Sequence, residues 1–283
     1  MHIFGIGTVV VDHVIELPDF PAEDTKVEVG EHWTQVGGPV PVALSTAAFF
    51  GAQTAFLGRW GQDAAGDFIS ETLIERGIDV SACKSAPNWS SGFAQVWVNA
   101  NNGCRTIAYS RGDFPIPNED DVTEAVLANC QILHLDGWAG DAAIKAATIV
   151  RGNGGTVVLD AGSVKPRLEE LLPLVDVLIA SRLFRISQFS SADASAKQLL
   201  SLGPTHVVTT DGANGATWIT ANSVVHEPAI SVKAVDTNGA GDIFSGCILH
   251  GVRTKLTPQQ SLKFANRVAG YACAQKGNDA LPP

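Results

Sequence analysis

Residues 236–246 of the 283-residue chain read D-T-N-G-A-G-D-I-F-S-G, and this stretch decides the expected fold. Residues 230–235 in front of it alternate as a strand does, and the small apolar residues behind it predict a buried helix. A strand, a glycine-rich turn and a helix start would aim several backbone N–H groups at one point, where the helix dipole adds partial positive charge. The turn is therefore suited to hold an anion or a developing negative charge. The short pattern G-x-G-D alone would also fit a turn with an acidic N-cap, but the longer string is more specific.

Two stretches in the N-terminal half extend this pattern. Gly37 and Gly38 precede a small apolar helix that runs to Gly51, and residues 56–67 read F-L-G-R-W-G-Q-D-A-A-G-D. Together with residues 236–246, which are similar to D-T-x-G-A-G-D-x-F-x-G, they resemble the ribokinase family of carbohydrate kinases, also called the phosphofructokinase-B or PfkB family. Matching pieces follow in family order over essentially the whole chain. The segment S-V-K-P-R at residues 163–167 and Ser181 are most similar to ketohexokinase-like members.

Composition argues against several classes of function. The chain has 45% hydrophobic and 17% charged residues and a net charge of -10 without a basic tract, so nucleic acids and anionic membranes are not expected partners. No apolar run approaches the ~18 residues of a membrane span, and no cleavable signal opens the chain. The five cysteines show no C-x-x-C spacing, which disfavours disulfides and a zinc site. We therefore expect a soluble, cytoplasmic enzyme.

Apolar strands alternate with amphipathic helices along the chain, which predicts a mostly parallel sheet covered by helices on both faces. The resemblance implies the same architecture, a three-layer α/β/α ribokinase-like fold in a single domain over residues 1–283. Strands are expected at residues 2–9, 53–57, 131–136, 156–160, 177–180 and 206–210. Helices are expected at residues 42–50, 67–76, 120–128, 142–151, 192–202, 241–253 and 258–276.

Two segments, at about residues 10–36 and 88–111, break this alternation and read as short strands with polar outer positions. Asn102-Gly103 is a strong hairpin signal, because these residues tolerate positive φ. The resemblance implies a small β-sheet lid over the sugar site that is often used for dimerisation, so a homodimer is expected. The tryptophans of these segments would pack in the lid core, or else form a dimer face or a sugar-stacking surface: Trp33, Trp89 and Trp97.

The resemblance implies roles for the residues around the glycine-rich turn. Asp242 is the expected general base, which takes the proton of an acceptor hydroxyl during phosphoryl transfer from ATP. An aspartate of ordinary low pKa is adequate for this role, because a loose transition state releases the proton late. The backbone amides of Gly239, Ala240 and Gly241 would form an anion hole for the migrating phosphoryl group.

The resemblance also assigns residues to the acceptor, a sugar or related polyol. Asp12 follows the first expected strand, where α/β sheets place ligands, and its carboxylate can accept two hydrogen bonds from sugar hydroxyls. Asp24 and Arg105 from the lid segments, with Gly37 and Gly38, complete the expected acceptor site. Turn capping is the alternative explanation of Asp12 and Asp24.

Two positions depart from the family pattern at the acceptor site. Members commonly have Gly-Gly-x-x-x-Asn, whereas this chain has Val42 in the asparagine position, and Pro39 replaces an asparagine of ketohexokinase-like members. Neither side chain can donate or accept a hydrogen bond, so this wall of the pocket is more apolar than usual. Either other residues form the hydrogen bonds that recognise the substrate, with Arg59, Asn99 and Arg105 as candidates, or the substrate presents an apolar edge to this wall.

A nucleotide loop is expected after the strand at residues 206–210. The pattern T-x-G-x-x-G places Thr210, Gly212 and Gly215 there, where the glycines would let the backbone approach ATP, although the same loop is also a good hairpin turn. Near the C-terminus, Asn266 and Gly277 fall where relatives line the adenine pocket.

Metal ions are expected to act in two places. Residues 181–184 lack the Asn-x-x-Glu of many relatives, so Mg²⁺ would be held mainly by water and ATP oxygens. Asp236 and Asn238 lie where many relatives bind a monovalent cation, which makes K⁺ a further candidate. The histidines show no paired ligand spacing, and His134, on an expected strand, is interpreted as a satisfied core histidine.

The sequence therefore indicates an ATP-dependent sugar kinase that phosphorylates a hydroxymethyl group. A nucleoside kinase on the same fold is one alternative, favoured by the apolar environment of Val42. A sugar- or nucleotide-binding relative without turnover is another, suggested by the missing Asn-x-x-Glu. Asp242 argues against that second alternative, because a protein that only binds needs no base.

Overall fold

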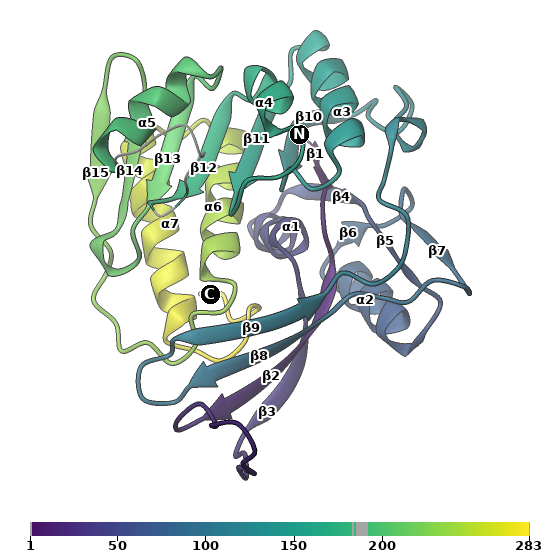
Figure 1. Cartoon of the computed structure of the whole chain (residues 1–283). Coiled ribbons are helices and arrows are strands. Elements are labelled where there is room, and N and C mark those ends of the chain that lie inside the picture. Colours follow the sequence, from purple (N-terminus) through teal and green to yellow (C-terminus); the bar gives the residue numbers. More distant parts are fainter. Residues whose placement is uncertain (1, 183, 185–191, 283) are drawn as a thin grey trace.

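The computed structural model describes residues 2–182, 184 and 192–282, and within them a nine-stranded sheet forms the middle layer (Figure 1). Its strand order is β15-β14-β13-β12-β11-β10-β1-β4-β6. All neighbouring pairs are parallel except those of β14, which is antiparallel to both β13 and β15. The strands, in this order, are Val224–Glu227, Ala216–Ile219, His206–Thr210, Val177–Ser181, Thr156–Ala161, Cys130–Leu135, His2–Ile6, Gln53–Leu57 and Ile78–Asp79.

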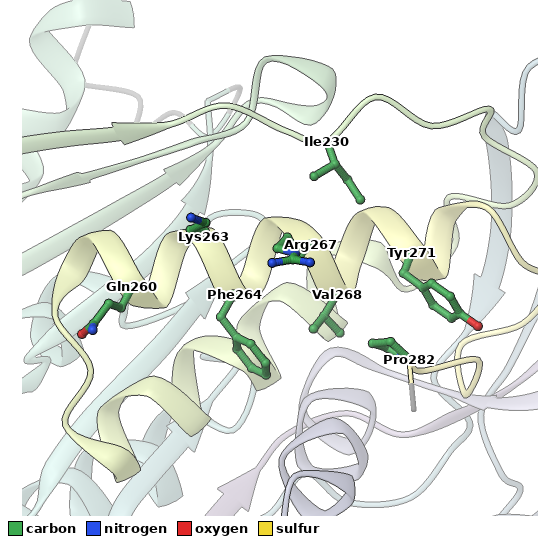
Figure 2. Close-up of a pocket in the computed structure, with 8 residues that line it drawn as sticks. All are labelled: Ile230, Gln260, Lys263, Phe264, Arg267, Val268, Tyr271 and Pro282. Carbon is green, nitrogen blue, oxygen red and sulfur yellow. The ribbon is translucent and has the colours of Figure 1, made fainter.

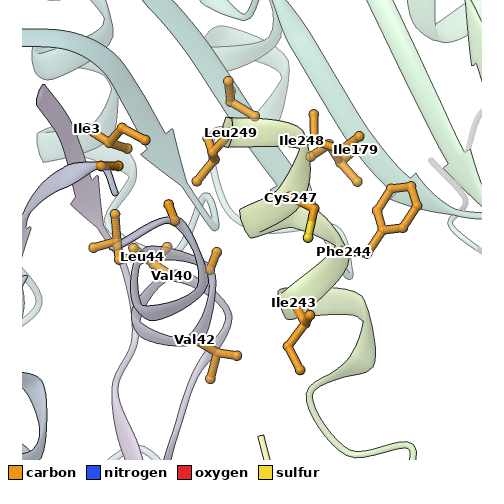
Figure 3. Packing of buried hydrophobic residues seen from close by; sticks show 14 of the residues in the cluster. Ile3, Val40, Val42, Leu44, Ile179, Ile243, Phe244, Cys247, Ile248 and Leu249 are labelled. Carbon is orange, nitrogen blue, oxygen red and sulfur yellow. The ribbon is translucent and has the colours of Figure 1, made fainter. Parts of the chain in front are cut away.

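Helices cover both faces of this sheet. One face carries α1 (Pro39–Phe49), α2 (Ala64–Glu75), α6 (Ala240–Thr254) and α7 (Pro258–Cys273), whose side chains share one core cluster. The other carries α3 (Gly140–Gly152), α4 (Leu168–Leu171) and α5 (Ala192–Ser201). Figure 3 shows the first core where α1 packs beside α6. The three-layer α/β/α fold expected from the sequence is therefore confirmed.

Successive side chains of each central strand enter opposite cores, as the two-residue period of a strand requires. On β10, Ile132 belongs to the core with α1 and α6, and Leu133 belongs to the core with α3. Each such buried side chain contributes about 1.5–3 kcal/mol to folding. Strands buried on both faces therefore read as continuous apolar runs, which is why the sequence locates them well. None of the described helices is both long and apolar enough to traverse a lipid bilayer.

A separate four-stranded sheet stands off the main layers, and we call it the lid sheet (Figure 1). It consists of β2 (Val10–Leu17), β3 (His32–Gly37), β8 (Phe93–Asn99) and β9 (Arg105–Ser110), in the order β3-β2-β8-β9. Strands β2 and β8 pair in parallel although about 80 residues separate them, and Val14, Val96 and Val98 form its core. The edge strand β9 is exposed along its whole length. Strands β5 (Arg59–Gly61) and β7 (Lys84–Ala86) form a third, separate sheet of two strands.

The three tryptophans of the predicted lid segments divide between two places. Trp33 packs against the core of the lid sheet, and Trp97 lies on β8. Trp89 precedes β8. The guanidinium carbon of Arg59 lies 5.7 Å from the centre of the Trp89 ring, and Phe114 lies beside this ring. Trp89 therefore packs beside strand β5, outside the core of the lid sheet.

The strand predicted at residues 230–235 is wrong. This segment is irregular chain between β15 and α6. Pro228 removes a backbone donor directly after β15. The amides of Val235 and Asp236 donate instead to the carbonyl of Cys273 at the end of α7, so the segment is tied to that helix and not to the sheet.

The helix predicted at residues 120–128 is also wrong. Only a 3-10 turn forms, at Glu119–Asp121, followed by irregular turns. The carboxylate of Asp121 accepts from the Asn118 amide and from Arg59 and Lys84, which fixes it inside the protein. These long-range contacts override the local helical pattern, a competition that sequence alone does not reveal.

Other boundaries differ by a few residues. Helix α1 begins at Pro39, because proline suits the first turn, and not at residue 42 as predicted. Helix α2 begins three residues early, at Ala64, because Asp63 accepts from the Gly66 amide and caps it. Helix α7 ends at Cys273, three residues before its predicted end.

His134 on β10 is a core histidine, as predicted, and its side chain is fully buried. Neither ring nitrogen makes a hydrogen bond of good geometry among the described residues, but the backbone of Val158 lies close enough to favour the charged ring. Burial lowers its pKa to about 4, because charging the ring in an apolar core is costly. An unfolded chain would take up this proton near pH 6.5, so protonation favours unfolding.

We expect the stability of the protein to fall as the pH drops from 6.5 towards 4 through this residue. The loss is about 2 kcal/mol at pH 5 and about 3 kcal/mol below pH 4. Urea unfolding at pH 7.5 and pH 5 checks it: His134→Leu should lose less stability between the two pH values than the parent. His226→Leu, an exposed histidine on β15, is the control and should behave like the parent. Equal acid sensitivity in the parent and His134→Leu would contradict the expectation.

Candidate active site

A cleft of about 320 Å³ lies between the lid sheet and the carboxyl ends of β1, β10 and β11. Three groups of residues line it. The start of α6 contributes Asn238, Gly239 and Asp242; the lid side contributes Asp12, Gly37, Gly38, Arg105, Ile107, Tyr109 and Arg111; and the ends of the central strands contribute Thr8, Asp136, Trp138, Asp160 and Lys165. Because the cleft joins two regions of the chain more than 200 residues apart, it gathers most of the predicted acceptor and catalytic residues.

Helix α6 presents free backbone donors to this cleft. Its N-cap is Gly239 in the left-handed conformation (φ 77°), and no side chain caps the helix. Among the described residues, the amides of Gly241 and Asp242 have no hydrogen-bond acceptor, while Ala240 donates to Thr237 over a long 3.4 Å. These donors and the helix dipole would attract an anion at this point.

Asp242, in the first turn of α6, lies half-buried on the wall of the cleft. Burial, reinforced by the neighbouring carboxylate of Asp160, raises the pKa of Asp242 to about 8. The ordinary low pKa expected from the sequence is therefore not what this environment gives. Asp160 at the end of β11 accepts a hydrogen bond from Ser245 (2.7 Å), and burial raises its own pKa to about 6.

Asp12 lies across the cleft on β2 and is buried. Its Oδ2 accepts from the Asn238 amide group at 3.0 Å and from Gln35 at 3.4 Å, so the lid sheet and the start of α6 meet at this carboxylate. Burial raises its pKa. A side chain on Gly37 would overlap the Asp12 carboxylate (2.4 Å), and one on Gly38, whose φ is 109°, would overlap the Thr8 carbonyl (2.3 Å). Both glycines are therefore required by close packing around Asp12.

The loop before α6 is anchored through Asp236. Its buried carboxylate accepts from the amides of Asn238 (2.8 Å) and Gly277 (3.3 Å). Asn278 follows, and it donates to the Val36 carbonyl on β3 while its buried Oδ1 has no partner among the described residues. Gly277 therefore joins the C-terminal segment to Asp236, and nothing here brings it to a nucleotide base.

The predicted nucleotide loop lies at the carboxyl end of β13, on the same edge of the sheet as the cleft. Gly212 has φ 54° and open space where a side chain would be, so a ligand could approach its backbone. Gly215 differs, because a side chain there would overlap the Glu227 carbonyl (2.2 Å). Asn266 donates to the Glu227 and Pro228 carbonyls and pins the same segment to α7. Thr210 ends β13 beside this loop.

Several predicted residues lie outside the cleft. Asp24 is exposed on the loop between β2 and β3, with φ 58°, and does not line the cavity. Arg59 is buried against Asp121 and so does not reach a substrate. Asn99 is part of the lid hairpin. Leu183 belongs to residues 181–184, which lack the Asn-x-x-Glu pattern, and it lies outside the described residues.

Sequence reasoning did not assign Trp138, Asp160, Lys165 and Arg111, although they line the cleft. Asp136, at the end of the strand predicted at residues 131–136, also lines the cleft. Its carboxylate accepts from the amides of Thr8 (2.7 Å) and Trp138 (2.9 Å), which ties the ends of β1 and β10 together. For Asp136, Trp138, Asp160 and Lys165 the available signal was a position at or shortly after the end of an apolar strand, whereas Arg111 follows the exposed strand β9.

A second hollow, of about 520 Å³, runs along α7 and is shown in Figure 2. Ile230, Phe264, Val268, Tyr271 and Pro282 give it apolar walls. None of the predicted site residues lines it, and none of its lining residues is acidic. The acidic side chains Asp12, Asp136, Asp160 and Asp242 lie instead in the cleft under the lid sheet.

The lid hairpin is bonded directly to the loop that precedes α6. The Gly103 carbonyl accepts from both the amide (3.2 Å) and the hydroxyl (2.8 Å) of Thr237. Gly103 has φ 69° and packs on the backbone of Ala234 and Val235. Thr237 thus connects the position of the lid sheet to the position of the α6 turn.

We expect Thr237→Val to weaken this connection. Loss of one hydroxyl hydrogen bond costs about 1 kcal/mol, which would raise the KM of a cleft ligand about five-fold. Thr237→Ser keeps the hydroxyl and is the control. Steady-state kinetics with varied acceptor check the expectation, and equal KM values for the Val and Ser variants would contradict it.

Known proteins are similar to this chain over its whole length. The family model described as pfkB family carbohydrate kinase matches residues 2–283. A deoxyribokinase of Salmonella typhi is 27% identical, over 100% of this chain and 96% of that protein, and a ketohexokinase of Mus musculus is 25% identical, over 99% and 98%. The solved structure of Arabidopsis thaliana ribokinase with ribose and ATP superposes with a TM-score of 0.81 at 24% identity, covering 99% of this chain and 95% of that one.

Proposed function

Because the chain belongs to the pfkB family of carbohydrate kinases and is a phosphotransferase with an alcohol group as acceptor, we propose that it transfers the γ-phosphoryl group of ATP to a hydroxymethyl group of a sugar or polyol. The acceptor would lie in the cleft under the lid sheet. The observation that carries the proposal is the position of Asp242 beside the uncapped amides of α6, with Asp12 facing them.

Each of these groups has a defined task in the transfer. Asp12, held by Asn238 and Gln35, would orient the acceptor by accepting from its hydroxyls. As the acceptor oxygen bonds to the γ-phosphorus, the bond from that phosphorus to the β,γ-bridging oxygen breaks and ADP leaves. Asp242 takes the hydroxyl proton, and the free amides of Gly241 and Asp242 stabilise the charge on the transferred group.

The side chains present in the cleft suit a Mg²⁺ ion that arrives bound to ATP better than a Mg²⁺ ion held mainly by protein ligands. Within the described residues, no three His, Cys, Asp or Glu side chains are grouped to hold a metal ion. Phosphate oxygens and water would then supply most ligands, with Asp160 and Asp136 near enough to the cleft to contact that water. Bound Mg²⁺ would neutralise developing charge on the phosphates. The unpartnered Oδ1 of Asn278, near Asp236 and Asn238, fits a monovalent cation such as K⁺.

A nucleoside kinase is the second candidate function, and the wall beside the acceptor favours it. Val42 and Pro39 line the cleft with Val10 and Ala94, and none of these side chains can form a hydrogen bond. Such a wall would accept the apolar part of a larger acceptor.

We further propose a homodimer joined through the exposed lid sheet, where Phe93 is 48% exposed. Light scattering on the purified protein would test this proposal.

A coupled ADP-release assay over sugars, sugar acids, sugar phosphates and nucleosides tests the proposed function. Acceptor-dependent ADP release with sugars or their derivatives supports it. Turnover of nucleosides alone would replace it with the second candidate. Binding of acceptors without ADP release would indicate a protein that has lost turnover.

A further inference from the structure

Strand β9 gives the lid sheet an unusual inner face. Its alternate residues Arg105, Ile107, Tyr109 and, just beyond its end, Arg111 all line the cleft. Two arginines stand at the two ends of this row. They serve different parts of the cleft.

Arg105 belongs to the end of the cleft where phosphoryl transfer would occur. Its positive charge favours the charged forms of both Asp236 and Asp242 and so counteracts the effect of burial on them. An arginine in this position suits the transferred phosphate. The presence of Arg105 therefore does not indicate whether the acceptor itself carries a charge.

Arg111 belongs to the other end. Its guanidinium carbon lies 3.5 Å from the centre of the Trp138 ring and 5.1 Å from that of Tyr109, and one of its nitrogens donates to the Tyr109 hydroxyl at 3.0 Å. Stacking covers the face of the guanidinium but leaves its other N–H donors, which lie in the plane of the group, free. Such in-plane donors can bind a carboxylate or a phosphate in a bidentate manner. Within the described residues Arg111 has no carboxylate partner.

Lys165 adds a second positive charge beside the same indole. Its ammonium lies 5.6 Å from the centre of the Trp138 ring and donates to Ser163. The carboxylates of Asp136 and Asp160 face Lys165 and offset part of its charge. Arg111 is therefore the less compensated of the two cations.

The position of Trp138 shows which ligand these cations would meet. Trp138 follows β10, whereas the predicted nucleotide loop follows β13, three strands away in the sheet. At a spacing of about 4.8 Å between strands, this separation is roughly 14 Å. Arg111 and Lys165 thus lie on the acceptor side of the cleft, apart from the expected place of ATP.

We propose that the acceptor is an anionic polyol, whose carboxylate or phosphate is bound by Arg111 and Lys165 against Trp138 while its hydroxyl is presented to Asp242. The inference rests on the proposed kinase function and specifies its substrate class. It also accounts for Val42 and Pro39, because a charged end group supplies the recognition that the apolar wall cannot.

Matched sets of acceptors test the inference and separate carboxylate from phosphate. The sets are ribose and ribonate; glucose and gluconate; and fructose, fructose 1-phosphate and fructose 6-phosphate, all of which keep a free hydroxymethyl group. We expect at least one anionic member to show kcat/KM at least about tenfold above its neutral counterpart. Preference for neutral members throughout would overturn the inference and leave the kinase function standing.

Variants of Arg111 give the sharper measurement. Arg111→Gln should raise the KM of the preferred anionic acceptor about 10- to 100-fold and leave the KM of ATP and that of neutral acceptors within about two-fold. Arg111→Lys keeps the charge but not the two-point geometry and should fall between. Arg151→Gln is the matched control, because Arg151 lies in the last turn of α3, outside the cleft. A rise in the KM of ATP, or an equal rise for neutral acceptors, would overturn the inference.

Thermal-shift binding keeps the two proposals distinguishable if no ADP is released. Anionic acceptors at millimolar concentration should then raise the melting temperature of the parent but not of Arg111→Gln, while neutral counterparts should raise neither. That result would retain the anion site and reject the kinase function. Absence of any Arg111-dependent shift would reject the anion site as well.

Discussion

Asp242→Asn is expected to lower kcat by about 10³-fold and, at the same time, to raise the stability of the protein. The catalytic loss follows because asparagine cannot take the acceptor proton, while its size leaves the start of α6 unchanged. The activity of the parent should rise with pH up to about 8, since only the deprotonated carboxylate can act as the base. Initial rates of ADP release between pH 6 and pH 9 check both points.

The gain in stability follows from the sign of the pKa shift. The folded protein raises the pKa of Asp242 from 3.8 to about 8, so it holds this proton more tightly than the unfolded chain. The contribution of Asp242 to stability is therefore greatest below pH 3.8 and is lost as the pH rises through 8. At pH 7 the cost is at most about 4 kcal/mol, and the neutral side chain of the Asp242→Asn variant would remove it. Functional groups held in costly surroundings commonly show this opposition between activity and stability.

Asp67→Asn is the matched control for this substitution. Asp67 also lies in the first turn of a helix, α2, but it is exposed and outside the cleft. It should leave kcat unchanged and alter stability by less than about 0.5 kcal/mol. If the Asp242→Asn variant kept more than a tenth of the parent activity, another group would have to be the base. If it lost stability, the burial argument would be wrong.

The residues predicted from the glycine-rich motif lie together at one end of the cleft, because a short contiguous motif carries them. Asp242 and the glycines before it occupy adjacent positions, so their geometry is local. Gly37 and Gly38 were found for the same reason. Asp12 and Arg105 lie in the cleft as the resemblance implied.

The group of residues around Trp138 was not predicted, because it depends on which strands are neighbours. Trp138 and Lys165 follow different strands, and they meet only because β10 lies beside β11 in the sheet. Arg111 reaches them from the lid sheet. Asp24 illustrates the opposite failure: it lies in a lid segment but on an exposed loop, and no local pattern distinguishes the two situations.

Asp121→Ala is expected to destabilise the protein by about 3–5 kcal/mol, the largest effect on stability that we anticipate from one substitution. The Asp121 side chain is 3% exposed and accepts from Arg59 at 2.5 Å, Lys84 at 2.7 Å and the Asn118 amide at 2.8 Å. Although burial opposes ionisation, the hydrogen bonds from Lys84 and Arg59 lower its pKa to about 2. Its removal leaves the Arg59 guanidinium, itself 8% exposed, without a countercharge.

Urea unfolding at pH 7 measures this loss, and the neighbouring residue provides the control. Asp120→Ala removes an exposed carboxylate from the same turn and should change stability by less than about 0.5 kcal/mol. The double variant Arg59→Met, Asp121→Ala should recover part of the loss, because no unpaired charge remains inside. The contribution of Asp121 in the parent should also disappear as the pH falls from 3.8 through 2, where the carboxylate takes up its proton. Equal effects of the two alanine substitutions would show that the buried ion pair does not hold this turn, and the missing helix at residues 120–128 would need another explanation.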